Sequence, residues 1–213
     1  MVGGYCYHVL NRGNGRAEVF HSPADYARFV ALMSEAQERL AIDLFSVCLM
    51  PNHFHFVMRP ATDDAVGDWM HWLLTTQVRR YHQQHRSSGR LWQGRFKAFP
   101  IQEDAHLLTV LRYVERNALT ANLVARAEQW PWGSLHWREV GNGLLKMSDP
   151  PVTLPSDWLE RVNTPFTQHE LTHLRACTNR QRPFGAAGWV ELTARRLGLT
   201  SSINIVGRPR NCR

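Results

Sequence analysis

The sequence predicts an α+β fold whose antiparallel sheet is assembled in the order β-α-β-β-α-β. Three observations support this order: a strand pattern at residues 5–11, an amphipathic helix that follows Ser22, and a hairpin over residues 42–59. A second long helix from about Val66 and a strand within residues 91–102 complete the set. This order is that of the ferredoxin-like or RRM-like plait, which many unrelated functions share.

The two helices of the plait follow from their start signals and apolar spacing. Ser22 and Pro23 are typical of a helix N-cap and first position. Apolar residues then recur at intervals of three and four, at Tyr26, Phe29, Val30, Met33, Ala36 and Leu40. The same spacing runs from Val66 to Tyr81, and the polar residues 87–89 end that helix.

A third helix is predicted after the plait, from about Asp104 to Asn117. Its buried stripe is marked by Leu107, Leu111, Val114 and Ala118. Tyr113 and Asn117 lie beside this stripe and are four residues apart. Because residues four apart lie on the same side of a helix, these two side chains should face the same way.

The composition changes near residue 141, which divides the chain into residues 1–140 and a C-terminal extension, residues 141–213. The first part has 15 Lys and Arg against 13 Asp and Glu, whereas the extension has 10 against 5. Proline-rich residues 149–155 indicate a linker, and helical patterns follow at residues 168–177 and 186–197. We therefore expect a basic, mainly helical extension.

The net charge of +7 and the pI of about 9.7 favour a polyanionic partner. The window from Arg79 to Lys97 holds six cations and no acid, which indicates either a phosphate-binding track or a solvated helix end. No apolar run approaches the ~20 residues of a membrane span, and no signal-peptide pattern is present. The four cysteines form no Cys-x-x-Cys pair. We therefore expect a cytoplasmic protein.

The most distinctive pattern is His53-Phe54-His55, in the second strand of the predicted hairpin. Alternation along a strand puts both imidazoles on one face and Phe54 on the other. Two imidazoles about 7 Å apart can converge on one metal ion, although two ordinary histidines on a half-exposed strand would look the same. An oxygen donor such as Asn117 would complete a site for Mg²⁺ or Mn²⁺.

Four motifs in order carry a resemblance to a known family. They are Cys48-Leu49-Met50-Pro51-Asn52-His53-Phe54-His55-Phe56-Val57, Leu91-Trp92-Gln93-Gly94-Arg95-Phe96, Arg112-Tyr113-Val114-Glu115-Arg116-Asn117-Ala118 and Trp130-Pro131-Trp132-Gly133-Ser134. Together with Tyr7-His8-Val9 and Asn11-Arg12-Gly13-Asn14, they resemble the single-tyrosine HUH transposases, and specifically the REP-associated tyrosine transposases. The resemblance covers roughly residues 5–137.

The resemblance implies a metal-dependent endonuclease and strand transferase that acts on single-stranded DNA at REP-like hairpins. Tyr113 would be the nucleophile that becomes joined to the 5′ phosphate. His53, His55 and Asn117 would hold the divalent ion, Mg²⁺ or Mn²⁺. The leaving 3′-hydroxyl would remain available, so that strands can be rejoined without ATP.

Five further residues are expected to contact DNA. Arg95 and Lys97 would bind phosphates of the hairpin stem near the active site. Arg12, Asn14 and Arg16 would read bases beside the hairpin, a role implied by the resemblance. The resemblance implies a monomer that works in cis, whereas related insertion-sequence transposases are dimers that share active sites. The C-terminal extension favours a monomer, with a dimer as the alternative.

Two other functions remain open at this point. A domesticated family member could bind hairpin DNA and regulate without cleaving it, although binding alone needs none of His53, His55, Tyr113 and Asn117. A metal-dependent phosphodiesterase of small nucleotides could use the same histidines without a covalent step. Full hydrolytic activity in a Tyr113→Phe variant would favour that second alternative.

Overall fold

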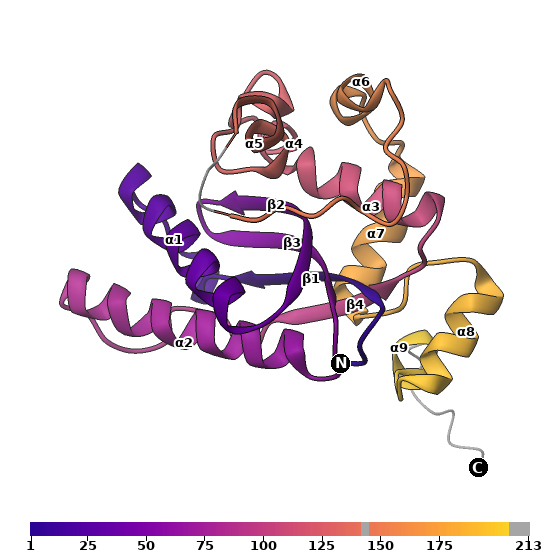
Figure 1. Ribbon diagram of the computed structural model, residues 1–213, viewed down its shortest axis with the longest axis horizontal. Helices are drawn as coiled ribbons and strands as arrows, with labels where there is room; N and C mark the ends of the chain where they lie inside the picture. The colour runs from indigo at the N-terminus through magenta and orange to yellow at the C-terminus, as the bar shows by residue number, and fades with distance from the viewer. Residues whose placement is uncertain (142–144, 205–213) are drawn as a thin grey trace, which may run out of the picture.

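The computed structural model describes residues 1–141 and 145–204, and it shows a four-stranded antiparallel sheet with helices on both faces (Figure 1). The strands are β1 (Cys6–Arg12), β2 (Ile42–Met50), β3 (His53–Pro60) and β4 (Lys97–Ile101). Their spatial order is β2-β3-β1-β4, and all neighbours are antiparallel. This confirms the predicted α+β plait.

Helices α1 (Pro23–Arg39) and α2 (Ala65–His85) pack on one face of the sheet. The predicted start of α1 is confirmed, because Ser22 forms a capping box with Asp25. The predicted apolar stripes of both helices pack into one hydrophobic core. From the sheet side, Phe54, Phe56 and Met58 contribute fully buried side chains to this core.

The opposite face of the sheet is covered by α3 (Ala105–Glu115) and by segments that follow it. The helix begins after Asp104, whose carboxylate accepts a hydrogen bond from the backbone N–H of His106. Its predicted stripe is fully buried. The helix ends two residues earlier than expected, and a separate short helix, α4 (Asn117–Thr120), carries Asn117.

Before residue 141 the described chain also has the short helices η1 (Asn14–Arg16), η2 (Ala127–Gln129) and α5 (Ser134–Val140).

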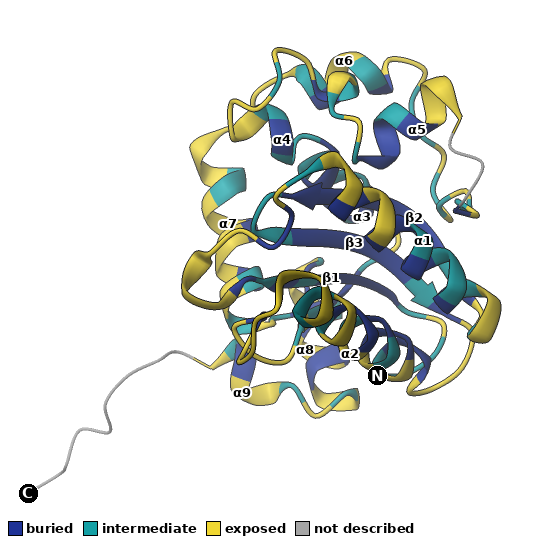
Figure 2. Ribbon diagram, turned by 90° about the vertical axis from the view of Figure 1, so that its left-hand side faces the viewer, coloured by how far each residue is buried: buried dark blue, intermediate teal, exposed yellow. Residues whose placement is uncertain are grey.

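The C-terminal extension packs against this second face. Its described helices are α6 (Trp158–Asn163), α7 (Gln168–Arg180), α8 (Ala187–Arg196) and α9 (Thr200–Ile203). The helical patterns predicted in the extension correspond to α7 and α8. Trp158 of α6 and Leu174 of α7 are buried in the same cluster as Leu107 of α3. Figure 2 shows the strands as buried ribbons between helices whose outer sides are exposed.

None of the helices within residues 1–141 and 145–204 is both long and apolar enough to cross a membrane. Cys6, Cys48 and Cys177 are free and buried. Cys212 and the basic end of the chain lie outside the described residues. The division of the chain at residues 140 and 141 stays a prediction.

Candidate active site

Three histidine rings and one phenol gather where α3 crosses the sheet. The ring centroids of His53 and His55 are 5.0 Å apart, and those of His55 and Tyr113 are 5.8 Å apart. His8 of β1 stacks on His55 with centroids 5.0 Å apart and meets Tyr113 edge-on at 6.1 Å. The cluster therefore joins two neighbouring strands to the helix above them.

One cavity of about 350 Å³ is lined by all four of the residues predicted to perform the chemistry: His53, His55, Tyr113 and Asn117. Arg12, the cross-strand partner of His53, lines it as well. Most of the remaining wall comes from α7 of the extension, with Leu10 of β1 and Thr120 of α4. The sequence placed the four residues in one site, whereas no local pattern indicated the contribution of α7.

Hydrogen bonds occupy Nδ1 of both predicted metal ligands. Asn52 donates its amide N–H to the carbonyl oxygen of Arg16, which turns its own carbonyl oxygen toward His53. That oxygen can only accept, so His53 donates from Nδ1 across 2.6 Å. His55 Nδ1 lies 2.8 Å from His8 Nε2. Nε2 is therefore the nitrogen that each of the two histidines has available for a metal ion.

His8 is the member of the cluster that the sequence analysis missed. It is fully buried, and its Nδ1 has no hydrogen-bond partner among the described residues. Burial lowers the pKa of His8 to about 3, so its ring is neutral at pH 7 and can accept a hydrogen bond from His55. His8 stands in the Tyr7-His8-Val9 motif of the family resemblance, but its place in an alternating strand equally fits a core histidine and indicated no role for it.

Burial also keeps the two predicted metal ligands neutral. It lowers the pKa of His53 to about 4, and the positive charge of Arg12 acts in the same direction. Burial and the neighbouring His53 hold the pKa of His55 well below its usual value. Because a histidine must be neutral to bind a metal, both rings can do so at neutral pH without first losing a proton.

Opposing influences act on the phenol of Tyr113. Burial raises its pKa, whereas the charges of Arg175 and Arg12 and a hydrogen bond from Asn117 lower it. The pKa of Tyr113 is raised overall, so the phenol is protonated at neutral pH.

The donor set fits a divalent cation. Two imidazole nitrogens and the amide oxygen of Asn117 are ligands that Mn²⁺ accepts, and Mg²⁺ accepts the oxygen readily. Within residues 1–141 and 145–204, no group of three His, Cys, Asp or Glu side chains could hold a metal ion. An ion bound by His53 and His55 would therefore take further ligands from Asn117, water or substrate.

A second cavity of about 310 Å³ adjoins the first and shares Arg12 with it. Arg95 and Lys97, both predicted to bind DNA, line this second cavity together with Gln93. Arg12 sits where the two cavities meet. Arg12 and the two cations Arg95 and Lys97 thus line one cavity, which adjoins the cavity of the histidine cluster.

Backbone hydrogen bonds hold the end of β1 at Arg12 and the loop that follows it in place. The N–H of Gly13 donates to the carbonyl oxygen of Asn52, and the N–H of Gln93 donates to that of Arg12. A Cβ at Gly13 would overlap the carbonyl oxygen of Ala17, so only glycine fits there. Asn14 and Arg16 are exposed on the same loop and do not line either cavity.

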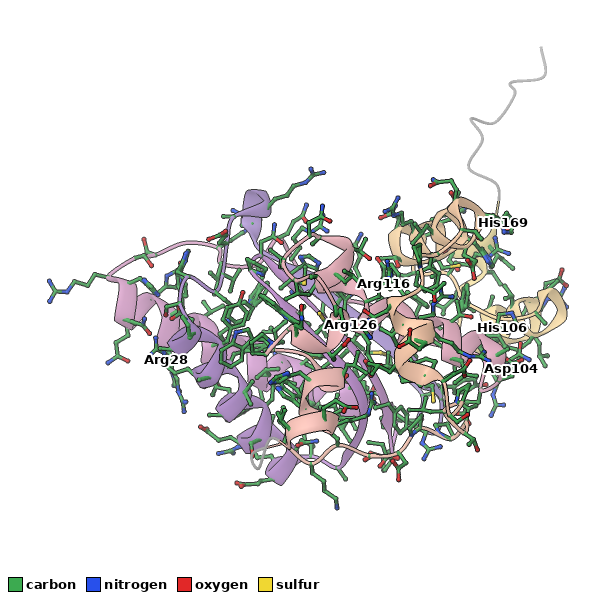
Figure 3. All side chains as sticks on the ribbon, turned by 90° about the horizontal axis from the view of Figure 1, so that it is seen from above. Arg28, Asp104, His106, Arg116, Arg126 and His169 are labelled. Atoms are coloured by element: carbon green, nitrogen blue, oxygen red, sulfur yellow. The ribbon has the colours of Figure 1, made fainter. Side chains whose placement is uncertain are left out.

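Hydrogen bonds and an ion pair with other segments of the chain hold α3, the helix that carries Tyr113, in place. The buried carboxylate of Glu115 accepts hydrogen bonds from Trp158 Nε1 at 2.8 Å and from Ser134 Oγ at 3.0 Å, and it pairs with Arg138. Arg112 donates to backbone carbonyls of residues 161–165. Arg116, labelled in Figure 3, donates to those of residues 162 and 163.

Comparison with known proteins defines the class. The family model of IS200-like transposases matches residues 1–117, which is more than half of the chain. The chain therefore belongs to the IS200-like transposase family, and it is a transposase enzyme.

The more specific resemblance inferred from the motifs is also confirmed. A Haemophilus influenzae protein that carries the provisional name REP-associated tyrosine transposase is 27% identical over 119 residues, 51% of this chain and 67% of that protein. A solved structure of a REP-associated tyrosine transposase bound to a REP hairpin matches with a TM-score of 0.55 at 17% identity. The match covers 79% of this chain and 95% of that chain, and it supports the fold.

Proposed function

We propose that this transposase is a metal-dependent endonuclease and strand transferase that acts on single-stranded DNA at REP-like hairpins. The observation that carries the proposal is the convergence of His53, His55, Tyr113 and Asn117 in one cavity. The adjoining cationic cavity supports a DNA substrate. A structurally similar transposase is bound to a REP hairpin, which supports the same class of partner.

In the proposed reaction the phenolic oxygen of Tyr113 attacks the scissile phosphorus. The bond from this oxygen to phosphorus forms as the bond from phosphorus to the 3′ oxygen breaks. The phenol loses its proton, and the leaving 3′ oxygen takes one up. The products are a 5′-phosphotyrosine and a free 3′-hydroxyl. The same steps in reverse, with another 3′-hydroxyl, rejoin strands without ATP.

The metal-binding groups would be Nε2 of His53, Nε2 of His55 and the amide oxygen of Asn117. A bound Mg²⁺ or Mn²⁺ ion supplies Lewis acidity that polarises the scissile phosphate. Asn117 also donates a hydrogen bond from its amide N–H to the backbone carbonyl oxygen of Tyr113, at 3.4 Å. Asn52 and His8 would hold the two imidazoles in the tautomer that presents Nε2.

Arg95 and Lys97 would bind phosphates of the hairpin stem along the second cavity, while Arg12, Asn14 and Arg16 would contact bases beside the hairpin. The anchoring of α3 by its own chain supports a monomer that acts in cis. Residues 1–140 would form the catalytic unit, and residues 141–213 would support it. The DNA substrate would be met in the cytoplasm.

A covalent-adduct assay tests the proposal. The protein is incubated with labelled single-stranded hairpin oligonucleotides of varied flanking sequence and with Mn²⁺ or Mg²⁺, and the products are run on a denaturing gel. We expect a shifted band that disappears in Tyr113→Phe, in His53→Ala and with a chelator. Tyr81→Phe, which alters a tyrosine outside the cavity, should keep the band.

The alternatives predict other results. Hairpin binding without any adduct, across all flanking sequences and both metals, would indicate a regulatory binding protein. Full hydrolysis by Tyr113→Phe would indicate a phosphodiesterase that needs no covalent step.

A further inference from the structure

One side of α7 forms a wall of the catalytic cavity. Leu171, Arg175 and Thr178 line the cavity and are spaced by four and three residues, so they share one face of the helix. Asn179 lies beside them, and Thr178 and Asn179 line both cavities. The family match ends at residue 117, so it assigns no role to α7.

Arg175 differs from the other arginines near the tyrosine helix. Arg112 and Arg116 are held by backbone carbonyls, and Arg138 is paired with Glu115. Arg175 is exposed to the cavity, and within the described part of the chain it has neither an ion pair nor a hydrogen bond. A guanidinium that has no protein acceptor keeps its fork of donors free for a phosphate.

The position of Arg175 relative to Tyr113 gives this cation a function. Arg12 reaches the cavity from β1 and Arg175 reaches it from α7, so the phenol lies in a space lined by a cation from each of two elements. Because Arg175 lines the same cavity as the attacking oxygen of Tyr113, it is also placed to act on the phosphate that this oxygen attacks.

We propose that Arg175 is a catalytic residue of strand transfer, which binds the non-bridging oxygens of the scissile phosphate. These oxygens gain negative charge as the Tyr113 oxygen adds to phosphorus, and the guanidinium stabilises that charge. In this role the guanidinium transfers no proton and forms no covalent bond, so the bonds and protons of the reaction balance as described above. Thr178 and Asn179 line the junction through which the strand passes from one cavity to the other. This inference rests on the proposed function.

The first test is the rate of adduct formation in Arg175→Gln under single-turnover conditions. We expect a fall of about 100-fold, the size seen when one charge-stabilising donor is removed from an active site. Arg175→Lys should recover part of the rate, because it restores the charge without the planar fork. The matched control is Arg180→Gln on the same helix, which lies outside both cavities and should react like the wild type. Unchanged thermal unfolding in Arg175→Gln would exclude a folding defect.

A neutral substrate sharpens this test. Once the cleaved position is known, its phosphate is replaced by a methylphosphonate, which has no negative charge for Arg175 to balance. The difference in rate between the wild type and Arg175→Gln should then narrow. A difference as large as on the natural phosphate would overturn the proposed role.

DNA binding gives a readout that does not depend on cleavage. In a Tyr113→Phe background, the affinity for a hairpin oligonucleotide is measured over a range of salt concentrations. Arg175→Gln should lower the slope of log affinity against log salt by about one phosphate contact, and Arg180→Gln should not. If the wild type forms adducts and Arg175→Gln forms them equally fast, this inference fails and the proposed function stands. If the wild type forms none, the proposed function fails and the catalytic role of Arg175 fails with it; a lowered salt slope would then show only that Arg175 contacts a phosphate.

Discussion

The two faces of the sheet are built by the same strands and have opposite chemistry. Toward α1 and α2, β3 presents Phe54 and Phe56, which stack at 4.4 Å and have no exposed surface. Toward α3 it presents His53 and His55. We call these the apolar face and the polar face. Because alternate residues of a strand point to opposite sides, a tightly packed apolar face fixes the positions of the side chains on the polar one.

The polar face contains buried polar groups, which can lower the stability of the fold. Glu115 is almost fully buried, and His8 has a buried nitrogen without a partner among the described residues. Buried polar atoms destabilise a fold unless they are hydrogen-bonded. The comparison therefore predicts that substitutions on the apolar face chiefly change stability, whereas those on the polar face divide between stability and chemistry.

The largest effect on stability is expected from Phe56→Ala on the apolar face. Phe56 stacks on Phe54 and meets Trp69 edge-on, so its truncation should leave a cavity and lower the free energy of unfolding by about 3–5 kcal/mol. Guanidinium unfolding measures this change. Leu123→Ala, at an exposed position, should change stability by less than about 0.5 kcal/mol. Equal losses in the free energy of unfolding of the two variants would contradict the claim that the apolar face stabilises the fold.

A smaller loss is expected from Glu115→Gln on the polar face. The substitution leaves Arg138 without its counter-charge and weakens the bonds from Trp158 and Ser134. We expect a loss of about 3 kcal/mol, reduced by the partial exposure of Arg138. Urea unfolding of Glu115→Gln, Arg138→Met and the double variant would test the pairing. Strictly additive losses would show that the two side chains do not stabilise each other.

His8→Phe should affect metal binding more than folding. The substitution keeps a flat ring in the same space but removes the acceptor for His55 Nδ1. Loss of such a supporting partner typically weakens metal affinity by about 10- to 100-fold. Calorimetric titration with Mn²⁺ measures it, with Tyr7→Phe on the same strand as the control. Wild-type affinity in His8→Phe would show that His8 does not orient His55.

The buried histidines also predict sensitivity to acid. Unfolded histidine has a pKa near 6.5, whereas the folded pKa values of His8 and His53 are about 3 and about 4. Below pH 6.5 the unfolded chain therefore binds more protons, so the free energy of unfolding should fall steadily as the pH drops from about 6.5 to 4. Above about pH 6.5 both histidines are neutral in the folded and the unfolded state, so they lower the free energy of unfolding only below that pH. Urea midpoints at several pH values, with chelator present, should show this fall, and His8→Phe should show a shallower one. Constant midpoints from pH 7.5 to 5 would contradict the prediction.

Much of the fold followed from periodicity. The strand order and the buried stripes of three helices could be predicted because each depends on local spacing of apolar residues. Among the candidate site residues, His53 and His55 could be identified from alternation, and Tyr113 and Asn117 from helix spacing together with the family motif. The structure places these four residues in one cavity.

The supporting residues could not be predicted, because they depend on which elements pack together. His8 is a single histidine in an apolar strand, and only the pairing of β1 with β3 brings it to His55. Asn52 resembles an ordinary turn residue until its amide is seen between Arg16 and His53. Arg175 lies in the extension, and no local pattern shows where α7 docks.

The central claim is that Tyr113 is the nucleophile on the polar face, and peptide mapping of the adduct tests it most directly. Tyr113 lies between Arg112 and Arg116, so trypsin releases it within a four-residue peptide, Tyr113-Val114-Glu115-Arg116. After nuclease treatment of the trapped complex, mass spectrometry should find this peptide carrying a nucleotide 5′ phosphate. An adduct on any other residue, or cleavage of hairpin DNA with this peptide unmodified throughout, would contradict the claim.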